Sequence, residues 1–293
     1  MNAESIVTGK TKVYGIVGWP VAHSLSPVMQ NAALQTAAVD AIYVPFAVEP
    51  TQLATAVSGL RAMHVSGFNV TIPHKTAIMP LLDELSPVAV QAGAVNTVVN
   101  QGGRLIGHNT DGEGLVASLA EDLGCPVAGS SVVLVGAGGA ACGALAALCR
   151  AGVRSVVVLN RSRKAADGLI TSLHDHFPHI LLRACALGEQ KEEVLRQSDL
   201  LINATSLGMA GEKIEGLSLA LLPDHAKVYD MVYTSSLTPL LHDAAERGIK
   251  AVNGLGMLIA QGELAFELWH GIPAASGVMR TALQSFLSST AKA

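Results

Sequence analysis

Lys75 and Asp111 are the side chains in this sequence that best suit proton transfer. The pattern predicts a helix that begins at Pro73, and Lys75 would then lie in its first turn. The helix dipole disfavours a cation there by a few tenths to about 1 kcal/mol, so stability alone would favour an acid. A lysine whose protonated form is destabilised suits acid–base chemistry, and a neighbouring carboxylate would oppose that effect. Asp111 is the candidate neighbour, which predicts a proton-transferring pair.

Polar side chains gather in four short stretches of the N-terminal third. We expect these stretches at the carboxyl ends of strands, where open α/β sheets bind ligands. They are His23–Pro27, Asn69–Lys75, Asn96–Thr97 and Gly107–Gly112. Helix capping is the structural alternative, because Ser26 precedes a proline as an N-cap residue would, and Thr110 with Glu113 matches a capping box. No cap requires Ser24, so that serine favours a ligand-binding role.

A glycine turn predicts a second kind of site. The apolar run Val132–Val135 precedes the pattern Gly136-x-Gly138-x-x-Ala141, and another strand-like run, Ser155–Leu159, follows at the expected distance. Gly136 permits a tight turn, and Gly138 lets a pyrophosphate approach the amides and the positive end of the helix that follows. The pattern therefore predicts a bound dinucleotide.

The strand after the glycine turn ends in a basic cluster, Asn160–Lys164. Sites that prefer NAD usually place an acid about 20 residues past the glycines, and here no acid occurs before Asp167. An arginine in that place can pair with a 2′-phosphate through bidentate hydrogen bonds. A solvated basic loop is the alternative. We therefore predict NADP(H) as the cofactor in preference to NAD.

Alternating strands and helices must position these side chains. A first α/β unit is predicted from strands at 13–18, 41–48 and 67–72 with helices from Pro27, near 50–61 and from Pro73, followed by a hairpin of 94–99 and 104–107. A helix at 114–123 leads to the second unit, whose further strands are predicted at 180–186, 200–204, 227–231 and 250–252, each separated by a helix-length segment. Two helices, 255–269 and 273–287, complete the chain. The fold class is α/β, with a doubly wound parallel sheet in the second unit.

Composition narrows the class of protein. The 293 residues are 50% hydrophobic and 14% charged with a net charge of -4, which suits two domains with ample core and argues against a nucleic-acid partner. The apolar run 132–149 is nearly long enough for a membrane span, but its glycines and the basic residues that follow favour an α/β unit. The first twelve residues lack a hydrophobic signal core, so the cytoplasm is the expected compartment.

Cysteines and histidines give no sign of a metal site. Cys125, Cys142, Cys149 and Cys185 form no C-x-x-C pair, which is typical of reduced core residues. We expect the histidines of the cluster 174–179 to lack the carboxylate or thiolate partners of a metal site, and we predict no metal there.

Seven motifs, in order across nearly the whole chain, resemble the shikimate dehydrogenase family. They are Ser24-x-Ser26-Pro27, Asn69-Val70-Thr71-x-Pro73-x-Lys75, Gly93–Thr97, Asn109–Gly112, Gly136–Gly139, Asn203-Ala204-Thr205-Ser206-x-Gly208-Met209 and Gly254-x-Gly256-Met257-Leu258-x-x-Gln261. The resemblance implies NADPH-dependent reduction of 3-dehydroshikimate to shikimate in chorismate and aromatic amino-acid biosynthesis. It also implies a discontinuous substrate domain, residues 1–111 and 254–293, and a Rossmann-type NADP-binding domain, residues 112–253.

The resemblance assigns roles to individual residues. Lys75 and Asp111 would act at the reacting oxygen, and Asn69, Asn96 and Gln261 would bind ring hydroxyls. The substrate carboxylate would be bound by Ser24, Ser26, Thr71 and Tyr233. The cofactor would contact Gly136, Ala137, Gly138, Gly139, Ala140, Asn160, Arg161, Ser162, Lys164, Thr205, Met231, Gly254 and Met257.

One position departs from the family pattern. The family often has a second basic residue four positions after the matching arginine, and that position here is Ala165. Arg163 and Lys164 supply positive charge nearby. We therefore expect enough charge to bind the 2′-phosphate, but the sequence does not define the geometry of that site. A relative that also oxidises quinate or accepts NAD is the closest alternative, and a non-catalytic ligand-binding protein is a weaker one, because Lys75 and Asp111 are both present. The expected partner is a small-molecule substrate, with the chain a monomer or a homodimer.

Overall fold

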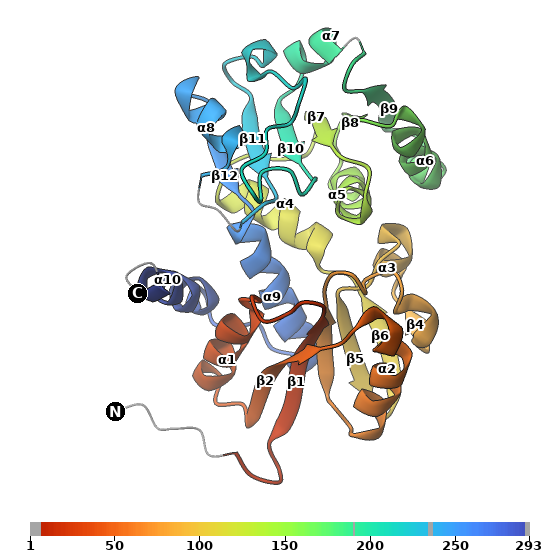
Figure 1. The fold of residues 1–293 in the computed structure, drawn as a ribbon, viewed down its shortest axis with the longest axis vertical. Coiled ribbons are helices and arrows are strands. Elements are labelled where there is room, and N and C mark those ends of the chain that lie inside the picture. Colours follow the sequence, from red (N-terminus) through yellow and green to blue (C-terminus); the bar gives the residue numbers. More distant parts are fainter. Residues whose placement is uncertain (1–6, 190, 234–236, 291–293) are drawn as a thin grey trace. The chain divides into compact units, whose positions relative to one another are not determined.

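The computed structural model describes residues 7–189, 191–233 and 237–290. The chain divides into two compact units, which Figure 1 labels by element. Unit 1 comprises residues 1–110 and 261–293, and unit 2 comprises residues 111–260. The predicted division into a substrate domain and an NADP domain has similar limits, but as an assignment of function it stays a proposal.

Unit 1 contains a mixed six-stranded sheet in the order β2-β1-β3-β5-β6-β4. Neighbouring strands β1, β2 and β3 are parallel, whereas β5 is antiparallel to both β3 and β6. The hairpin of β5 and β6 turns between Gln101 and Arg104, as predicted. The strands are β1 (Lys12–Gly18), β2 (Ala41–Ala47), β3 (Gly67–Val70), β4 (Glu84–Leu85), β5 (Thr97–Gln101) and β6 (Arg104–His108).

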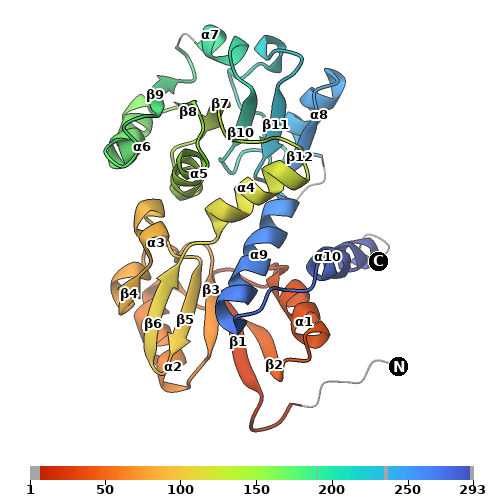
Figure 2. The ribbon, with the colours of Figure 1, turned by 180° about the vertical axis from the view of Figure 1, so that it is seen from behind.

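Helices cover both faces of this sheet. Buried side chains of α2 and α3 pack with Val17, Phe68 and Val98 on one face. On the other face, α1 packs against β2 and lies beside α10, which Figure 2 shows clearly. The helical elements are α1 (Ser26–Thr36), η1 (Pro50–Gln52), α2 (Leu53–Ala62), η2 (Met79–Leu81), α3 (Pro87–Ala92), α10 (Val278–Thr290) and the part of α9 (Leu255–His270) from residue 261 onward.

Unit 2 is a parallel sheet in the order β12-β11-β10-β7-β8-β9, the doubly wound arrangement that the sequence predicts. Its strands are β7 (Ser131–Val135), β8 (Ser155–Asn160), β9 (Leu181–Ala186), β10 (Leu200–Asn203), β11 (Lys227–Asp230) and β12 (Ala251–Asn253). Its helical elements are α4 (Asp111–Glu121), α5 (Gly139–Arg150), α6 (Arg163–His174), α7 (Lys191–Arg196), η3 (Leu219–Leu221), α8 (Pro239–Glu246) and the first residues of α9. The α/β class is therefore confirmed.

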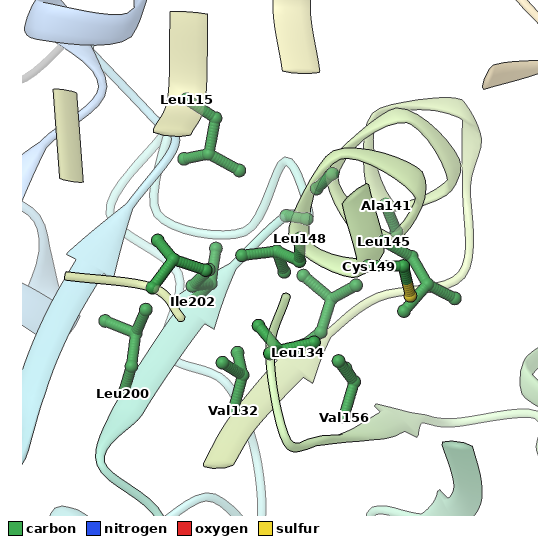
Figure 3. Close-up of a cluster of buried hydrophobic side chains, with 14 of the residues drawn as sticks. Leu115, Val132, Leu134, Ala141, Leu145, Leu148, Cys149, Val156, Leu200 and Ile202 are labelled. Atoms are coloured by element: carbon green, nitrogen blue, oxygen red, sulfur yellow. The ribbon is translucent and has the colours of Figure 1, made fainter. Parts of the chain in front are cut away.

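Alternate side chains of each central strand enter different cores in unit 2. Val132 and Leu134 pack against α4, α5 and α6, in the cluster that Figure 3 shows. Val133 and Val135 pack instead with residues of α7, η3 and α8. Burial on both faces explains why β7 reads as an unbroken apolar run. The run 132–149 is thus a buried strand and helix, and none of the described helices combines the length and apolar character of a membrane span.

Three local predictions are wrong. Residues 72–78 form turns rather than a helix from Pro73, because Pro80 follows too closely for the predicted helix to continue. The helix α1 begins at Ser26 itself, and Leu25 is its N-cap, without a side-chain hydrogen bond. Between β10 and β11 the described chain forms turns and η3 instead of an α-helix. The elements β4 and α3 were not predicted, although Ser86 before Pro87 is a helix-start signal for α3.

Candidate active site

Buried amide side chains form a hydrogen-bonded network in unit 1 where β3 ends and β5 begins. The Asn69 Nδ2 donates to the Asn96 carbonyl oxygen at 3.1 Å and to the Thr97 Oγ1 at 3.0 Å. The Asn69 Oδ1 accepts a hydrogen bond from the Tyr43 hydroxyl at 2.6 Å. The amide of Asn69 is therefore held in one orientation, with a second lone pair of Oδ1 still able to accept from a ligand hydroxyl.

Asn96 connects this network to the end of β6 and to α9. Its Oδ1 accepts from the Thr110 backbone N–H at 2.8 Å, and its Nδ2 donates to the Thr110 Oγ1 at 2.9 Å. A longer bond of 3.4 Å runs from Nδ2 to the Gln261 Oε1, and the Thr110 hydroxyl donates to the Gln261 carbonyl at 3.0 Å. The structure thus brings together Asn69, Asn96 and Gln261, which the sequence assigns to one ligand.

The capping box predicted at Thr110 is wrong. The Thr110 backbone N–H donates to Asn96, and the Glu113 carboxylate pairs with the Arg150 guanidinium at 2.9 Å. Both groups have partners far away in the sequence, so spacing alone could not reveal them.

Lys75 lies half-buried in the turn that follows β3. Its carbonyl oxygen accepts from the Val95 backbone N–H at 2.8 Å, which fastens the turn directly beside Asn96. The argument from a helix dipole therefore fails, because no helix begins at Pro73. The placement at the end of β3 still puts Lys75 at the edge of the sheet where ligands of α/β folds bind.

Hydroxyl groups occupy the turn after β1 and the end of β3. The Ser24 Oγ accepts from the Ser26 backbone N–H at 3.3 Å, in a short turn that leads into α1. Thr71 is held by its backbone N–H, which donates to the Val17 carbonyl at 2.9 Å. Its methyl group contacts Gly18, where a Cβ would collide with it. These residues therefore share one end of the parallel strands β1 and β3.

The glycine turn of unit 2 joins β7 to α5 as predicted. Gly136 has φ +115°, and a Cβ there would lie 3.0 Å from the Thr205 Cγ2, so only glycine suits this position. At Gly138 and Gly139 an added Cβ would meet no atom within 4 Å. The open space before the N-terminus of α5 fits a pyrophosphate, whose charge the helix dipole would stabilise.

The side chains of the basic cluster after β8 are of two kinds. Some stabilise the fold, and others form no ion pair with a described residue. The Ser162 hydroxyl caps α6 by accepting from the Ala165 N–H at 3.3 Å, and Asn160 donates to the Ser162 carbonyl. Arg163 pairs with Glu189 at 2.8 Å. In the part of the chain that the structure describes, Arg161 and Lys164 are exposed and form no ion pair. These two cations fit the 2′-phosphate of NADP(H), without the basic residue that the family often has at position 165.

A polar network supports three more of the residues that are predicted to contact the cofactor. The Thr205 hydroxyl donates to the Asn203 Oδ1 at 2.7 Å, and the Met231 N–H donates to the Asn203 carbonyl at 3.0 Å. Gly254 contacts the Met231 carbonyl so closely that a Cβ would not fit. Thr205, Met231 and Gly254 thus lie along the ends of β10, β11 and β12, three adjacent strands.

Asp111 and Tyr233 are electrostatic neighbours within unit 2. Burial raises the pKa of the Tyr233 phenol, and the negative charge of Asp111 raises that pKa further. Asp111 is the first residue of α4, immediately after the Thr110 that Asn96 holds. A protonated phenol beside a carboxylate can donate a hydrogen bond to an anionic ligand.

Sequence reasoning missed three buried residues of these networks: Tyr43, Asp230 and Thr238. Thr238 precedes Pro239 and caps α8, which is a recognisable helix-start signal. Asp230 ends an apolar strand, and a lone acid in such a place could have been marked. Tyr43 gave no local signal, because tyrosine is common in half-buried strands.

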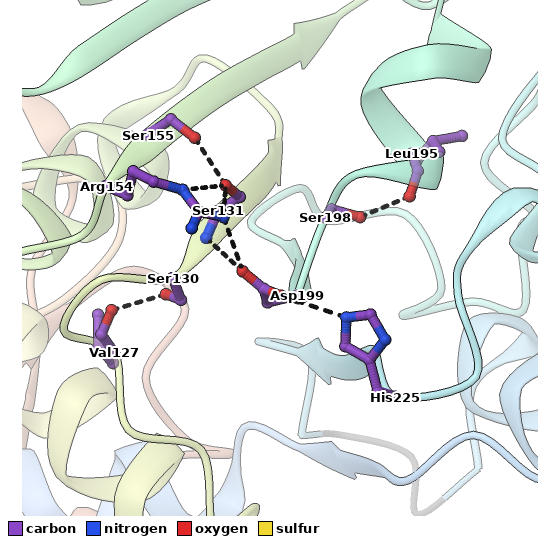
Figure 4. Close-up of polar contacts among 9 residues, drawn as sticks. All are labelled: Val127, Ser130, Ser131, Arg154, Ser155, Leu195, Ser198, Asp199 and His225. Atoms are coloured by element: carbon purple, nitrogen blue, oxygen red, sulfur yellow. Dashed lines mark hydrogen bonds and ion pairs between the residues drawn. The ribbon is translucent and has the colours of Figure 1, made fainter.

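A second polar cluster lies at the opposite ends of the unit 2 strands, and Figure 4 shows its members. Asp199 accepts from the Ser131 N–H at 2.7 Å and lies 3.2 Å from the His225 Nε2. The residue types match a hydrolase triad, but the carboxylate stands between the serine and the histidine. The imidazole of a triad must contact the hydroxyl to activate it, and here it does not. We therefore interpret this cluster as a set of contacts that stabilises the strand ends.

Among the described residues, one group could share a metal ion: His242, Asp243 and Glu246 on α8. The Lys213 ammonium lies 3.2 Å from the Asp243 Oδ1 and already neutralises that carboxylate, so the group carries no argument for a metal.

A parallel sheet with a glycine turn and a basic strand end gives unit 2 the architecture typical of dinucleotide-binding α/β domains, and the same chain carries a buried amide network in unit 1. Family models agree: "Shikimate dehydrogenase substrate binding domain" matches residues 16–98, "Shikimate / quinate 5-dehydrogenase" matches 118–209, and "Shikimate 5'-dehydrogenase C-terminal domain" matches 254–284. The chain belongs to the shikimate dehydrogenase family.

Named relatives cover almost the whole chain. A shikimate dehydrogenase (NADP(+)) of Geobacter metallireducens is 52% identical, over 94% of this chain and 96% of its own length. The structure of a Thermus thermophilus shikimate 5-dehydrogenase in complex with NADP(H) and shikimate has a TM-score of 0.83 at 36% identity, covering 94% of this chain and 99% of that one. A Corynebacterium glutamicum quinate dehydrogenase in complex with NAD also has a TM-score of 0.83, at 30% identity, covering 95% and 99%.

Proposed function

We propose that this chain catalyses the reversible, NADP-dependent reduction of 3-dehydroshikimate to shikimate, a step of chorismate and aromatic amino-acid biosynthesis. The observation that carries the proposal is the buried network of Asn69, Asn96 and Gln261, since fixed amides are suited to reading ring hydroxyls. Membership of a family whose named relatives are NADP-dependent shikimate dehydrogenases supports it. In this proposal residues 1–111 and 254–293 form the substrate domain, and 112–253 form the cofactor domain.

The ring hydroxyls of the substrate would bind to the amide network. Asn69 has both N–H groups engaged, so it would accept a hydrogen bond from a hydroxyl through Oδ1. Asn96 would exchange its long bond to Gln261 for a bond to the substrate, because 3.4 Å is long for an N–H···O hydrogen bond. A ligand that lacks these hydroxyls would leave buried amides without partners, which is a basis for specificity.

Hydroxyl groups would bind the substrate carboxylate. Ser24, Ser26, Thr71 and Tyr233 can each donate one hydrogen bond, and a bond to a charged acceptor contributes about 1.5–3 kcal/mol. Two or more such bonds rival an ion pair and avoid the cost of burying a guanidinium.

Lys75 and Asp111 would carry the proton chemistry at the reacting oxygen. When bound, the cofactor supplies the hydride that reduces the carbonyl carbon. Lys75, in its protonated form, would donate a proton to the carbonyl oxygen, and in the reverse direction it would take up the proton of the hydroxyl. Asp111 would accept a hydrogen bond from the same hydroxyl and orient it. When two such groups interact, the shared proton is a property of the pair and not of either residue alone.

Unit 2 would hold NADP(H) through three groups of residues. Gly136, Ala137, Gly138, Gly139 and Ala140 would face the pyrophosphate, and Asn160, Arg161, Ser162 and Lys164 would face the adenosine phosphate. Thr205, Met231, Gly254 and Met257 would surround the nicotinamide. The open space at Gly138 and the unpaired guanidinium of Arg161 support these assignments.

A relative with broader substrate or cofactor range is the alternative. The likeness to a quinate dehydrogenase bound to NAD keeps that alternative open. The basic, acid-free end of β8 favours NADP, because a guanidinium gains much from a phosphate and little from a hydroxyl. We propose a cytoplasmic enzyme, since none of the four cysteines, all of which the structure describes, forms a disulfide, as expected in a reducing compartment. That the enzyme acts as a monomer or a homodimer stays a prediction.

The test is to incubate the purified protein with shikimate and NADP+ and to quantify both products. Equal amounts of NADPH and 3-dehydroshikimate are expected. If neither product forms, and the protein is folded by its circular dichroism spectrum, the proposed function is wrong.

A further inference from the structure

Tyr43 holds the helix α1 in place through its backbone. Its N–H donates to the Asn31 Oδ1, and the Asn31 Nδ2 donates back to its carbonyl oxygen, both at 2.9 Å. Asn31 lies on α1, and its Nδ2 also donates to the Pro27 carbonyl within the first turn. The start of α1 at Ser26 is therefore fixed relative to β2.

The side chain of Tyr43 reaches in the other direction, across β1 to β3. Tyr43 pairs with Tyr14 on β1, and Asn69 of β3 pairs with Ile16, two residues further along β1 on the same face. The Tyr43 hydroxyl donates to the Asn69 Oδ1 at 2.6 Å. Its ring centroid lies 6.0 Å from that of Trp269, and Tyr43 is only 2% exposed. The surrounding residues therefore hold the side chain in this orientation.

Complete burial raises the pKa of the Tyr43 phenol, and the side chain of Ser26 opposes part of that rise. The Tyr43 hydroxyl donates to the Asn69 Oδ1, and the Asn69 Nδ2 donates to the Thr97 Oγ1. A directed chain of hydrogen bonds therefore runs from Tyr43 through Asn69 to Thr97.

We infer that Tyr43 is a positioning residue that sets Ser26 and Asn69 in register for one substrate. Its hydroxyl orients the Asn69 side chain, and its backbone anchors the helix that carries Ser26. In the proposed function, which this inference rests on, Ser26 binds the substrate carboxylate and Asn69 a ring hydroxyl. Tyr43 thus fixes the spacing between the two ends of the substrate without contacting it.

The chain offers a matched pair of variants for the test. Tyr43→Phe removes the hydroxyl and keeps the buried ring. Tyr14→Phe makes the same change at another buried tyrosine of unit 1, whose ring centroid lies 5.3 Å from that of Trp269. Both variants lose one phenolic hydroxyl from a buried side chain, so an effect on the fold alone would be similar in the two.

Calorimetry of shikimate and of NADP+ with the wild-type protein and both variants gives the decisive result. Tyr43→Phe is expected to raise the Kd for shikimate about five- to tenfold, the loss typical of one neutral hydrogen bond, with an unchanged Kd for NADP+. Tyr14→Phe is expected to leave both values unchanged. If Tyr43→Phe and Tyr14→Phe have the same shikimate Kd, the inference is overturned.

A double-mutant cycle separates positioning from a general loss of packing. Asn69→Ala in the Tyr43→Phe background should cost less in shikimate affinity than Asn69→Ala alone, because the amide has already lost the hydroxyl that orients it. Full additivity would contradict the inference. If the wild-type protein binds no shikimate, the proposed function fails and this inference falls with it. If the wild-type protein binds shikimate and Tyr43→Phe binds it equally well, the role of Tyr43 is refuted, while the proposed function is not.

Discussion

Asn203 donates a hydrogen bond of 2.8 Å to the completely buried carboxylate of Asp230. The same carboxylate accepts from the Val232 N–H at 3.1 Å and from the Thr238 hydroxyl at 2.6 Å. Because Tyr233 lies between Val232 and Thr238, one acid anchors both ends of the segment that carries this tyrosine. Asn203 in turn holds Thr205, so the acid supports predicted substrate and cofactor contacts together.

Replacing this acid should destabilise the protein strongly. Asp230→Ala leaves Asn203, Val232 and Thr238 without their buried acceptor, and we expect a loss of about 3 kcal/mol in the free energy of unfolding. Asp243→Ala, at a partly exposed carboxylate paired with Lys213, should cost less than about 1 kcal/mol. Urea unfolding at pH 7 measures the free energy of unfolding of both variants. Equal losses would show that the buried Asp230 network stabilises the protein no more than the partly exposed ion pair of Asp243.

Lys75→Ala should reduce kcat about 10²-fold or more, the usual effect of losing a general acid or base. Asp111→Asn should also reduce kcat. If the two act as a unit, the double variant should be no slower than about the slower single one. Steady-state oxidation of shikimate measures all three, with Lys10→Ala as a control at an exposed lysine. Fully multiplicative losses would mean that the two residues act independently.

Arg161→Ala should weaken the preference for NADPH over NADH. Its guanidinium forms no ion pair among the described residues and is free to bind a phosphate, so we expect a loss of about tenfold or more in kcat/KM for NADPH. Arg163→Ala is the matched control, since Arg163 already pairs with Glu189 and should affect NADPH much less. An Arg161→Ala enzyme with undiminished preference for NADPH would contradict the predicted clamp.

Unfolding should become easier as the pH falls from 7 to 5, partly because of His270. Burial, and then the charge of Lys12, lower the pKa of this imidazole, whose ring centroid lies 4.4 Å from that of Phe266, with the two rings tilted. The unfolded chain therefore binds more protons in this range, and the stability that neutral His270 contributes is complete above its ordinary pKa and is lost as the pH falls below it. His270→Gln should reduce the slope of the unfolding free energy against pH. His179→Gln, at an exposed site, is the control, and equal slopes in wild type and His270→Gln would refute the role of His270.

The glycine turn could be predicted because its signal is local. Gly136, Gly138 and the apolar run before them specify a strand, a tight turn and a helix by their own conformational limits. The same holds for the hairpin of β5 and β6, where two glycines, Gly102 and Gly103, have positive φ. In such places the sequence constrains the backbone over a few residues.

The environment of Lys75 could not be predicted from spacing. A proline at 73 suggests the start of a helix, but the turn is fixed by a hydrogen bond to Val95, twenty residues away along the chain. The contacts of Asn69 with Tyr43 and of Asn203 with Asp230 likewise join residues on different strands. Sequence patterns identify the residue types that can bind a ligand, whereas the partners that orient them depend on the tertiary structure.

Values of kcat/KM for shikimate and quinate, each with NADP+ and with NAD+, test the central claim most directly. The account predicts that shikimate with NADP+ gives the highest value, exceeding both quinate with NADP+ and shikimate with NAD+ by about tenfold or more. A higher value for quinate, or for NAD+ over NADP+ with shikimate, would contradict it and favour the quinate dehydrogenase alternative.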